Sequence, residues 1–174
     1  MQIETRHFAG FEFWSVGSLE IQRNADGSLA EYSHTLPEGV RSNRYSAGPF
    51  CRFGLPGAPN AAGVYAITIG YELQYIGEAV DLAQRFGPSG YGKIHPRNCH
   101  HDGQSTNCKL NFRVLEAAKR GSAARVWFHP ADDRLVTESR LRGELLPPWN
   151  GRGVSTRHPS EQRDRPRVAR GSAS

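Results

Sequence analysis

Two short runs rich in β-branched and aromatic residues constrain the fold of this chain more than any other feature. Residues 63–69 read Gly-Val-Tyr-Ala-Ile-Thr-Ile, and residues 72–77 read Glu-Leu-Gln-Tyr-Ile-Gly. Residues of these types favour strands, and Gly70 in the short connection favours a turn. The sequence therefore predicts an antiparallel β-hairpin.

The hairpin carries two tyrosines whose relative placement depends on the turn. If the turn is centred on Gly70, Tyr65 lies opposite Tyr75 and Gly63 lies opposite Gly77. Two phenols then project side by side, and the flanking glycines leave room for a substrate or another backbone. Aromatic pairs are also ordinary stabilisers of a sheet, so packing in the core is the alternative reading of the two tyrosines.

Helical patterns surround a further strand after the hairpin. Asp81 is a candidate N-cap for a helix that carries Arg85. A second helix is expected over residues 110–119, a strand over residues 125–130 and a last helix over residues 133–146. The chain is thus expected to be an α+β protein in which helices flank a small, mainly antiparallel sheet.

Three segments are expected along the chain. Residues 1–60 alternate aromatic and polar positions and end in a loop signal, which indicates a β-rich N-terminal extension. Residues 61–151 hold the hairpin and the helices and form the core. Residues 152–174 contain six arginines against two acidic residues, so this tail accounts for +4 of the net charge of +5. A disordered basic tail is expected, which either attracts phosphates or exists without a ligand.

The remaining composition favours a cytoplasmic protein. No run of about 20 apolar residues could cross a membrane, and the first residues lack the layout of a signal peptide. Three cysteines cannot all pair with one another, so reduced thiols are expected. The group Cys99, His100, His101 and Cys108 suggests zinc, but eight residues separate the cysteines, where two to four are usual. Solvated loop histidines are the alternative.

The last helix contains an acidic residue on its apolar face. Leu135, Leu141 and Leu145 form the apolar stripe, and Glu138 lies within it. A buried carboxylate needs a partner, because leaving it unpaired costs several kcal/mol. An ion pair with an arginine and a hard cation such as Mg²⁺ or Mn²⁺ both satisfy that need. The other charged side chains of the helix are expected to face water: Arg140, Arg142 and Glu144.

Taken in order, these elements resemble the GIY-YIG endonuclease superfamily over about residues 61–151. The family core is a hairpin with two tripeptides, a helix with an arginine and a later helix with a glutamate. This sequence matches it with Gly63-Val64-Tyr65, Tyr75-Ile76-Gly77, Arg85, Glu138 and Asn150. Small stand-alone, restriction-like members are the most similar in layout. The resemblance implies a GIY-YIG core with the N-terminal extension outside it.

The sequence departs from the family pattern at two positions. Glu78 stands where repair-type members often have lysine, and Ser89 stands where many members have a further tyrosine or histidine. Tyr91, Lys93 or His95 in the following loop could take the place of that residue.

The resemblance implies hydrolysis of a phosphodiester at a one-metal site. Glu138 would hold Mg²⁺ or Mn²⁺ against the scissile phosphate, and Arg85 would neutralise the developing charge. Tyr65 would orient or deprotonate the attacking water, and Tyr75 would bind the phosphate or Tyr65. Asn150 would hold the end of the last helix.

The leading functional hypothesis is a metal-dependent DNA endonuclease, with a site-specific, restriction-like enzyme as its first form. Duplex DNA is the expected partner, and residues 1–60 together with residues 91–111 could serve recognition or a homodimer. A DNA-binding module of the same fold without catalysis is the alternative from another class. Structure-specific repair-type cleavage and RNA cleavage also stay open, because phosphate chemistry does not report the sugar.

Overall fold

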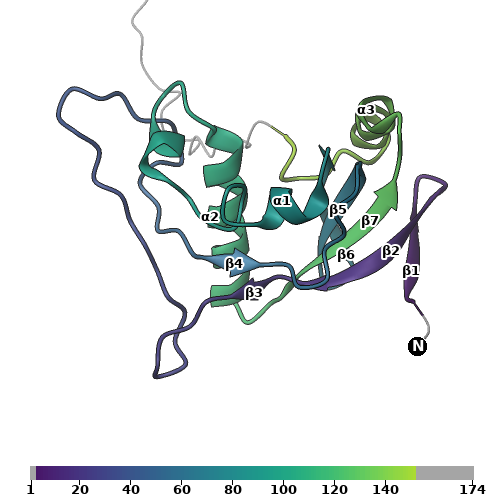
Figure 1. Cartoon of the computed structure of the whole chain (residues 1–174), viewed down its shortest axis with the longest axis horizontal. Helices are drawn as coiled ribbons and strands as arrows, with labels where there is room; N and C mark the ends of the chain where they lie inside the picture. The colour runs from purple at the N-terminus through teal and green to yellow at the C-terminus, as the bar shows by residue number, and fades with distance from the viewer. Residues whose placement is uncertain (1–2, 152–174) are drawn as a thin grey trace, which may run out of the picture.

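An antiparallel sheet of five strands forms the centre of the molecule, in the order β1-β2-β7-β5-β6 (Figure 1). A computed structural model describes residues 3–151. The strands of the sheet are β1 (Thr5–Phe8), β2 (Phe11–Ser18), β5 (Gly63–Ile69), β6 (Glu72–Ala79) and β7 (Ala124–Pro130). A second, two-stranded sheet joins β3 (Glu20–Ile21) to β4 (Phe53–Gly54).

Within residues 3–151, three α-helices and one short 3-10 helix complete the α+β architecture. They are α1 (Leu82–Phe86), α2 (Ser105–Lys119), α3 (Arg134–Leu145) and the 3-10 helix η1 (Pro96–Cys99). As predicted, Asp81 caps α1, because its side chain accepts a hydrogen bond from the Gln84 amide at 2.8 Å. None of the helices in the described part of the chain combines the length and hydropathy needed to cross a membrane.

Helix α2 begins five residues before the predicted start at residue 110. Its first turns are polar in sequence, yet Asn107, Cys108 and Asn111 are buried there. The Asn111 amide bonds the backbone carbonyls of Cys51 and Tyr91, each at 2.9 Å. Because these buried side chains are polar and hydrogen-bonded, the first turns show no helical spacing of apolar residues. The hydrophobic pattern therefore does not predict them.

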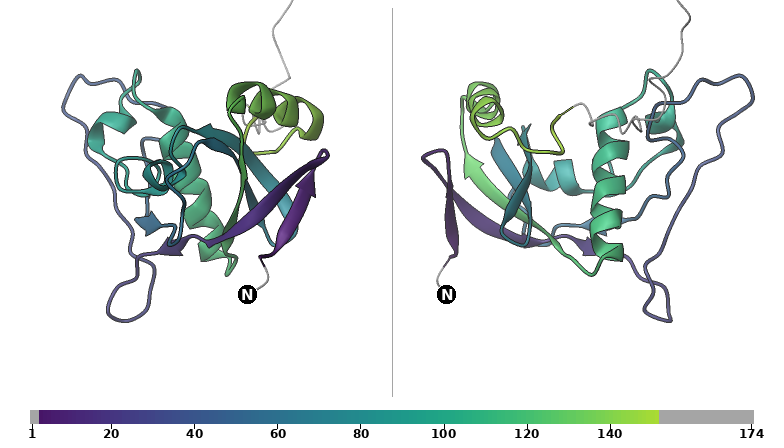
Figure 2. Two further views of the ribbon diagram at one scale, coloured as in Figure 1. Left: turned by 45° about the vertical axis from the view of Figure 1, so that its right-hand side comes forward. Right: turned by 180° about the vertical axis from the view of Figure 1, so that it is seen from behind.

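The two faces of the sheet support separate hydrophobic cores. Tyr65 and Ile67 of β5 face α1 and α2, where they join a core that includes Phe86 and Leu110. Val64 and Ala66, which alternate with them, face α3 and pack with Leu141. Figure 2 shows α3 and α2 on opposite sides of the sheet. Alternation along one strand thus positions two helical layers at once.

The N-terminal strands belong to the same sheet as the hairpin. Strand β2 pairs antiparallel with β7, with Trp14 opposite Phe128. Between β3 and β4 the chain makes a long excursion away from the sheet (Figure 1). Asn43 anchors this excursion, because its side chain donates to the Asn98 carbonyl at 2.6 Å. The predicted boundary at residue 60 is therefore crossed by the sheet. The predicted tail, 152–174, lies outside the described residues.

The predicted register of the hairpin is wrong by two residues. Tyr65 lies opposite Gly77, and Ile67 lies opposite Tyr75. The turn contains two residues, with Gly70 at φ 56°, and an irregularity after Ile67 adds another residue on β6. A glycine within the turn does not have to lie at its centre, and a bulge is invisible to a count of residue types.

Candidate active site

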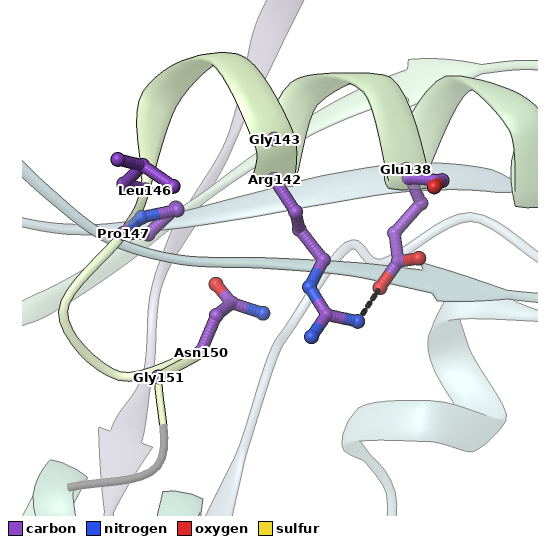
Figure 3. Close-up of a pocket in the computed structure, with 8 residues that line it drawn as sticks. Glu138, Arg142, Gly143, Leu146, Pro147, Asn150 and Gly151 are labelled. Atoms are coloured by element: carbon purple, nitrogen blue, oxygen red, sulfur yellow. Dashed lines mark hydrogen bonds and ion pairs between the residues drawn. The ribbon is translucent and has the colours of Figure 1, made fainter.

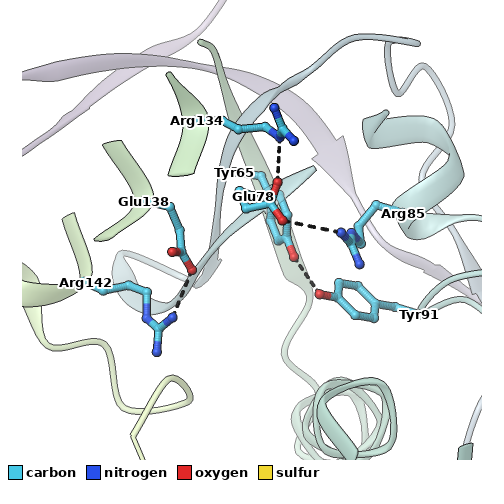
Figure 4. A network of polar contacts seen from close by, with 7 residues as sticks. All are labelled: Tyr65, Glu78, Arg85, Tyr91, Arg134, Glu138 and Arg142. Atoms are coloured by element: carbon cyan, nitrogen blue, oxygen red, sulfur yellow. Dashed lines mark hydrogen bonds and ion pairs between the residues drawn. The ribbon is translucent and has the colours of Figure 1, made fainter. Parts of the chain in front are cut away.

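Three tyrosine side chains gather on the face of the sheet that α1 and α2 cover. The rings of Tyr65 and Tyr75 lie 6.1 Å apart between centroids, because diagonal neighbours on one face are within reach of each other. The Tyr65 hydroxyl is 2.8 Å from the Tyr91 hydroxyl (Figure 4). The predicted side-by-side phenols are present, although the predicted pairing of strands is not.

Of the three loop residues that could join the tyrosines, only Tyr91 does so. Its ring is buried and stacks edge-on against Phe86. Lys93 lies by a different cavity, beside β3 and β4. The His95 ring hydrogen-bonds the Pro88 carbonyl at 3.2 Å, and its backbone amide donates to Asn98 at the start of η1. Lys93 and His95 are therefore not brought to the tyrosine cluster.

Glycines 63 and 77 leave space for aromatic rings. A Cβ on Gly77 would collide with the Tyr65 ring, and a Cβ on Gly63 would collide with the Phe128 ring and the His129 carbonyl. Rings of the protein itself thus occupy the space beside these two glycines. From the sequence, a substrate or another backbone was expected as the close neighbour. Gly77 is opposite Tyr65 in the register, which is why the ring lies over it.

Burial keeps the hairpin tyrosines protonated. Tyr65 is fully buried, and burial, followed by the Tyr91 and Tyr75 phenols, raises its pKa well above the ordinary 10.0. Burial likewise raises the pKa of Tyr75, with Tyr91 and the Glu138 carboxylate adding to the shift. Arg85 opposes the shift at Tyr65 without reversing it. These phenols are hydrogen-bonding groups and poor bases in this state.

Arg85, carried by α1, faces the tyrosine cluster from one side. Its guanidinium lies 5.6 Å from the Tyr91 ring centroid and 3.8 Å from the Glu78 carboxylate. Glu78 also accepts a hydrogen bond from Arg134 of α3 at 2.7 Å. Burial opposes the charged form of Arg85, but the pKa is raised because Tyr91, Tyr65 and Glu78 outweigh it. One carboxylate therefore binds cations from two helices.

Glu138 of α3 approaches the cluster from the other side (Figure 4). The predicted stripe is wrong at one end, because Leu135 is 61 % exposed while Thr137 and Leu141 are buried. Glu138 borders that buried pair, and its side chain is only 15 % exposed. The helix is rotated relative to the leucine pattern because the threonine packs inward and bonds Asp133 at 3.1 Å.

Glu138 is paired with an arginine of its own helix. Arg142 donates to Oε1 of Glu138 at 3.0 Å, which is the arginine ion pair that the sequence left open as an alternative (Figure 3). The Arg142 side chain is 45 % exposed, so it also faces water as predicted. Oε2 of Glu138 makes no hydrogen bond within residues 3–151. Both residues line an open cavity of about 470 Å³ that extends to Asn150. One carboxylate oxygen is thus available on the cavity side of the helix.

Asn150 ties the loop after α3 to the edge of the sheet. Its side chain donates to the Ile76 carbonyl at 2.6 Å and accepts from the Ile76 amide at 2.8 Å. The Trp149 amide donates to the Gln74 carbonyl at 2.8 Å, at the irregular position of β6. Because β6 is the edge strand, these bonds satisfy backbone groups that would otherwise be open. Asn150 thereby fixes the loop next to Glu138.

Glu138 is the residue that could hold a metal ion. Within residues 3–151, no group of three or more His, Cys, Asp and Glu side chains is placed to do so. The candidate zinc group does not assemble there, and Cys99 and Cys108 are buried free thiols. A single carboxylate with a free oxygen on an open cavity fits Mg²⁺, which keeps several waters and takes phosphate oxygens.

The sequence gives little signal for two charged residues of the site. It marks Glu78 only as a departure from lysine, and nothing in it distinguishes Arg134. Arg142 does have a local signal, because a glutamate followed by an arginine four residues later favours a helical ion pair. The pairing of Glu78 with Arg134 joins positions 56 residues apart, so no local signal exists for it.

No family model, no curated protein and no solved structure matches the chain.

Proposed function

We propose that the protein is a metal-dependent nuclease that hydrolyses phosphodiester bonds in DNA. One observation carries the proposal: the hydroxyls of Tyr65 and Tyr91 lie between Arg85 and Glu138 (Figure 4). Arg85 offers donors to phosphate oxygens, and Glu138 offers an oxygen to a cation. A phosphodiester that contacts both groups would lie over the tyrosine hydroxyls.

The side chains divide the chemistry according to their exposure. Arg85 is about one-third exposed, with its side chain at 35 %, so it can meet a phosphate and stabilise charge on it. Tyr65 and Tyr75 keep their protons and therefore orient water or phosphate by hydrogen bonds. When bound at Glu138, Mg²⁺ or Mn²⁺ would polarise the phosphate and activate water. Tyr91 holds Tyr65 in place.

Arg85 and Glu138 each have an ion-pair partner in the absence of substrate. The Arg85–Glu78 contact of 3.8 Å is loose, so a phosphate oxygen can replace Glu78. Arg142 occupies only one oxygen of Glu138 and is 45 % exposed, so it can turn toward solvent. The substrate phosphate would therefore replace Glu78 at Arg85, and the cation would replace Arg142 at Glu138. Because both residues already have a charged partner, the additional cost of desolvation is limited.

Cleavage by the purified full chain tests the proposal. With Mg²⁺ or Mn²⁺ the wild type is expected to cut duplex DNA. Glu138→Gln, which keeps the shape and removes the charge, should lower the rate by about a hundredfold or more. Glu144→Gln is the matched control, because Glu144 pairs with Arg140 at the same helical spacing and 2.7 Å. A Glu138→Gln variant as fast as Glu144→Gln would reject the assigned site.

A DNA-binding module without catalysis is the second candidate. It is favoured by the ion pairs, because Glu78 and Arg142 already pair with Arg85 and Glu138. This candidate predicts salt-sensitive binding and no metal-dependent products. The same assay, run on branched DNA, single-stranded DNA and RNA, separates repair-type and RNA cleavage from cleavage of duplex. Discrete ends on genomic DNA would indicate a restriction-like enzyme.

A further inference from the structure

A second open cavity, of about 560 Å³, adjoins the cavity that contains Glu138. Asn150 and Gly151 line both cavities, so the two share a wall. Arg44 and Lys109 contribute positive charge to the second cavity, and the other described residues that line it include no carboxylate. The cavity is therefore basic without local compensation.

Lys109 lines this cavity, and the charges of two arginines act on it from nearby. Lys109 of α2 is half-buried, and burial, Arg142 of α3 and Arg113 together lower its pKa. Arg113 lies one helical turn after Lys109, and its Nε atom is buried without a hydrogen-bond partner within residues 3–151. Neither Lys109 nor Arg113 forms an ion pair with any of those residues. Clustered like charges repel one another unless an anion joins them.

We propose that Lys109 and Arg142, which line the two adjoining cavities, form a second phosphate subsite beside the candidate active site. The subsite binds a phosphodiester of the same DNA strand whose scissile phosphate meets Arg85 and Glu138, and it rests on the proposed function in that respect. Arg142 connects the two positions. When Glu138 takes a cation, the guanidinium released from it is free to bind the neighbouring phosphate.

The lining of the cavity suits a nucleic acid backbone. Ser105 and Thr106 add hydroxyls near Lys109, and such neutral donors accompany basic side chains in contacts to phosphate and sugar. Two open cavities with a common wall at Asn150 suit an extended polyanion.

Lysine reactivity provides a test on the unaltered protein. The chain contains three lysines, Lys93, Lys109 and Lys119. Acetylation of the wild type, with and without DNA and in the presence of EDTA, is read for each lysine by mass spectrometry. DNA is expected to protect Lys109 and to leave Lys119, at the other end of α2, as reactive as before.

Binding of a labelled duplex and of a single strand, measured in EDTA by fluorescence anisotropy, tests the same site in variants. Lys109→Gln should weaken binding roughly tenfold and reduce the slope of log affinity against log salt by about 1. Lys119→Gln is the matched control and should change neither quantity, because Lys119 pairs with Glu31 at 3.1 Å.

Wild-type affinity and salt slope in Lys109→Gln, or unchanged reactivity of Lys109 with DNA, would overturn the subsite. So would a wild type that binds neither form of DNA. If the wild type cuts DNA while Lys109 stays unprotected, the subsite is wrong and the nuclease proposal stands. If DNA protects Lys109 but no metal-dependent product forms, the subsite stands and the nuclease proposal is wrong.

Discussion

Tyr65 shows at the scale of one residue how burial sets the available chemistry. Its hydroxyl bonds Tyr91 at 2.8 Å, inside a core where a phenolate would lose its hydration. Deprotonation of water by Tyr65 was one expected mechanism. The raised pKa instead favours orientation of water, so within the proposed mechanism the activation of water depends on the cation at Glu138.

Loss of stability at high pH follows from the same burial. The folded protein keeps the Tyr65 proton beyond pH 10.0, whereas the unfolded chain releases it near that value. Stability is therefore complete below about pH 10 and falls above it, by about 1.4 kcal/mol per pH unit for each such tyrosine. Urea unfolding on both sides of about pH 10 measures this slope.

Tyr65→Phe is expected to make that slope shallower, because the variant has no proton to hold at this position. Tyr71→Phe is the control within the same hairpin, since Tyr71 is 91 % exposed. An identical slope in wild type and Tyr65→Phe would show that the buried phenol does not govern the alkaline transition.

The edge strand β6 is the element on which the site depends. It presents Tyr75 to the cluster and Ile76 to the other core, and its open edge is covered by the loop after α3. Asn150 imitates the backbone of a neighbouring strand, since its amide both donates to and accepts from Ile76. The end of α3 is thereby fixed against the strand that carries Tyr75.

Asn150→Ala is expected to loosen this edge. Loss of two hydrogen bonds should lower the free energy of unfolding by about 1 to 3 kcal/mol, measured by urea unfolding. Hydrogen exchange at the Ile76 amide should accelerate at the same time, because its acceptor is removed. Asn24→Ala, which removes a bond to Ser28 in an exposed turn, serves as control. A protected Ile76 amide in Asn150→Ala would contradict the assignment.

At the scale of the whole molecule, the N-terminal region and the site share one sheet. Strand β2 lies against β7, which pairs on its other side with β5. Leu19, Phe53 and Leu55 belong to the same core as Tyr65. The N-terminal residues therefore support the site directly, in addition to any contact they make with a partner.

A chain that lacks residues 1–60 is expected not to fold cooperatively. Removal of β2 opens the edge of β7, and removal of Phe53 and Leu55 empties part of the core around Tyr65. Near-UV circular dichroism and thermal unfolding measure the loss. A chain that lacks residues 152–174 is the comparison, because it keeps all the contacts described within residues 3–151. Cooperative unfolding of the chain without residues 1–60 would show that the core of residues 61–151 is independent.

Much of the element order was predictable because local signals are strong there. Asp81 before α1, Gly121 after α2 and Asp133 before α3 all lie at or next to a helix end. Turn length, the bulge in β6 and the rotation of α3 were not predictable. Each depends on a small difference in packing, such as Thr137 facing inward in place of Leu135.

The sequence by itself determined the hairpin and the α+β class, because strand propensity and helix caps act over a few residues. The candidates Tyr65, Tyr75, Arg85 and Glu138 follow from the resemblance to a family and not from those local signals. Only the tertiary structure decided that Tyr91 joins them, that Glu78 pairs with Arg134, and that the charge of Arg142 acts on Lys109. These relations join residues distant in the chain. They depend on which faces of the sheet and helices become buried together, and no local pattern encodes that choice.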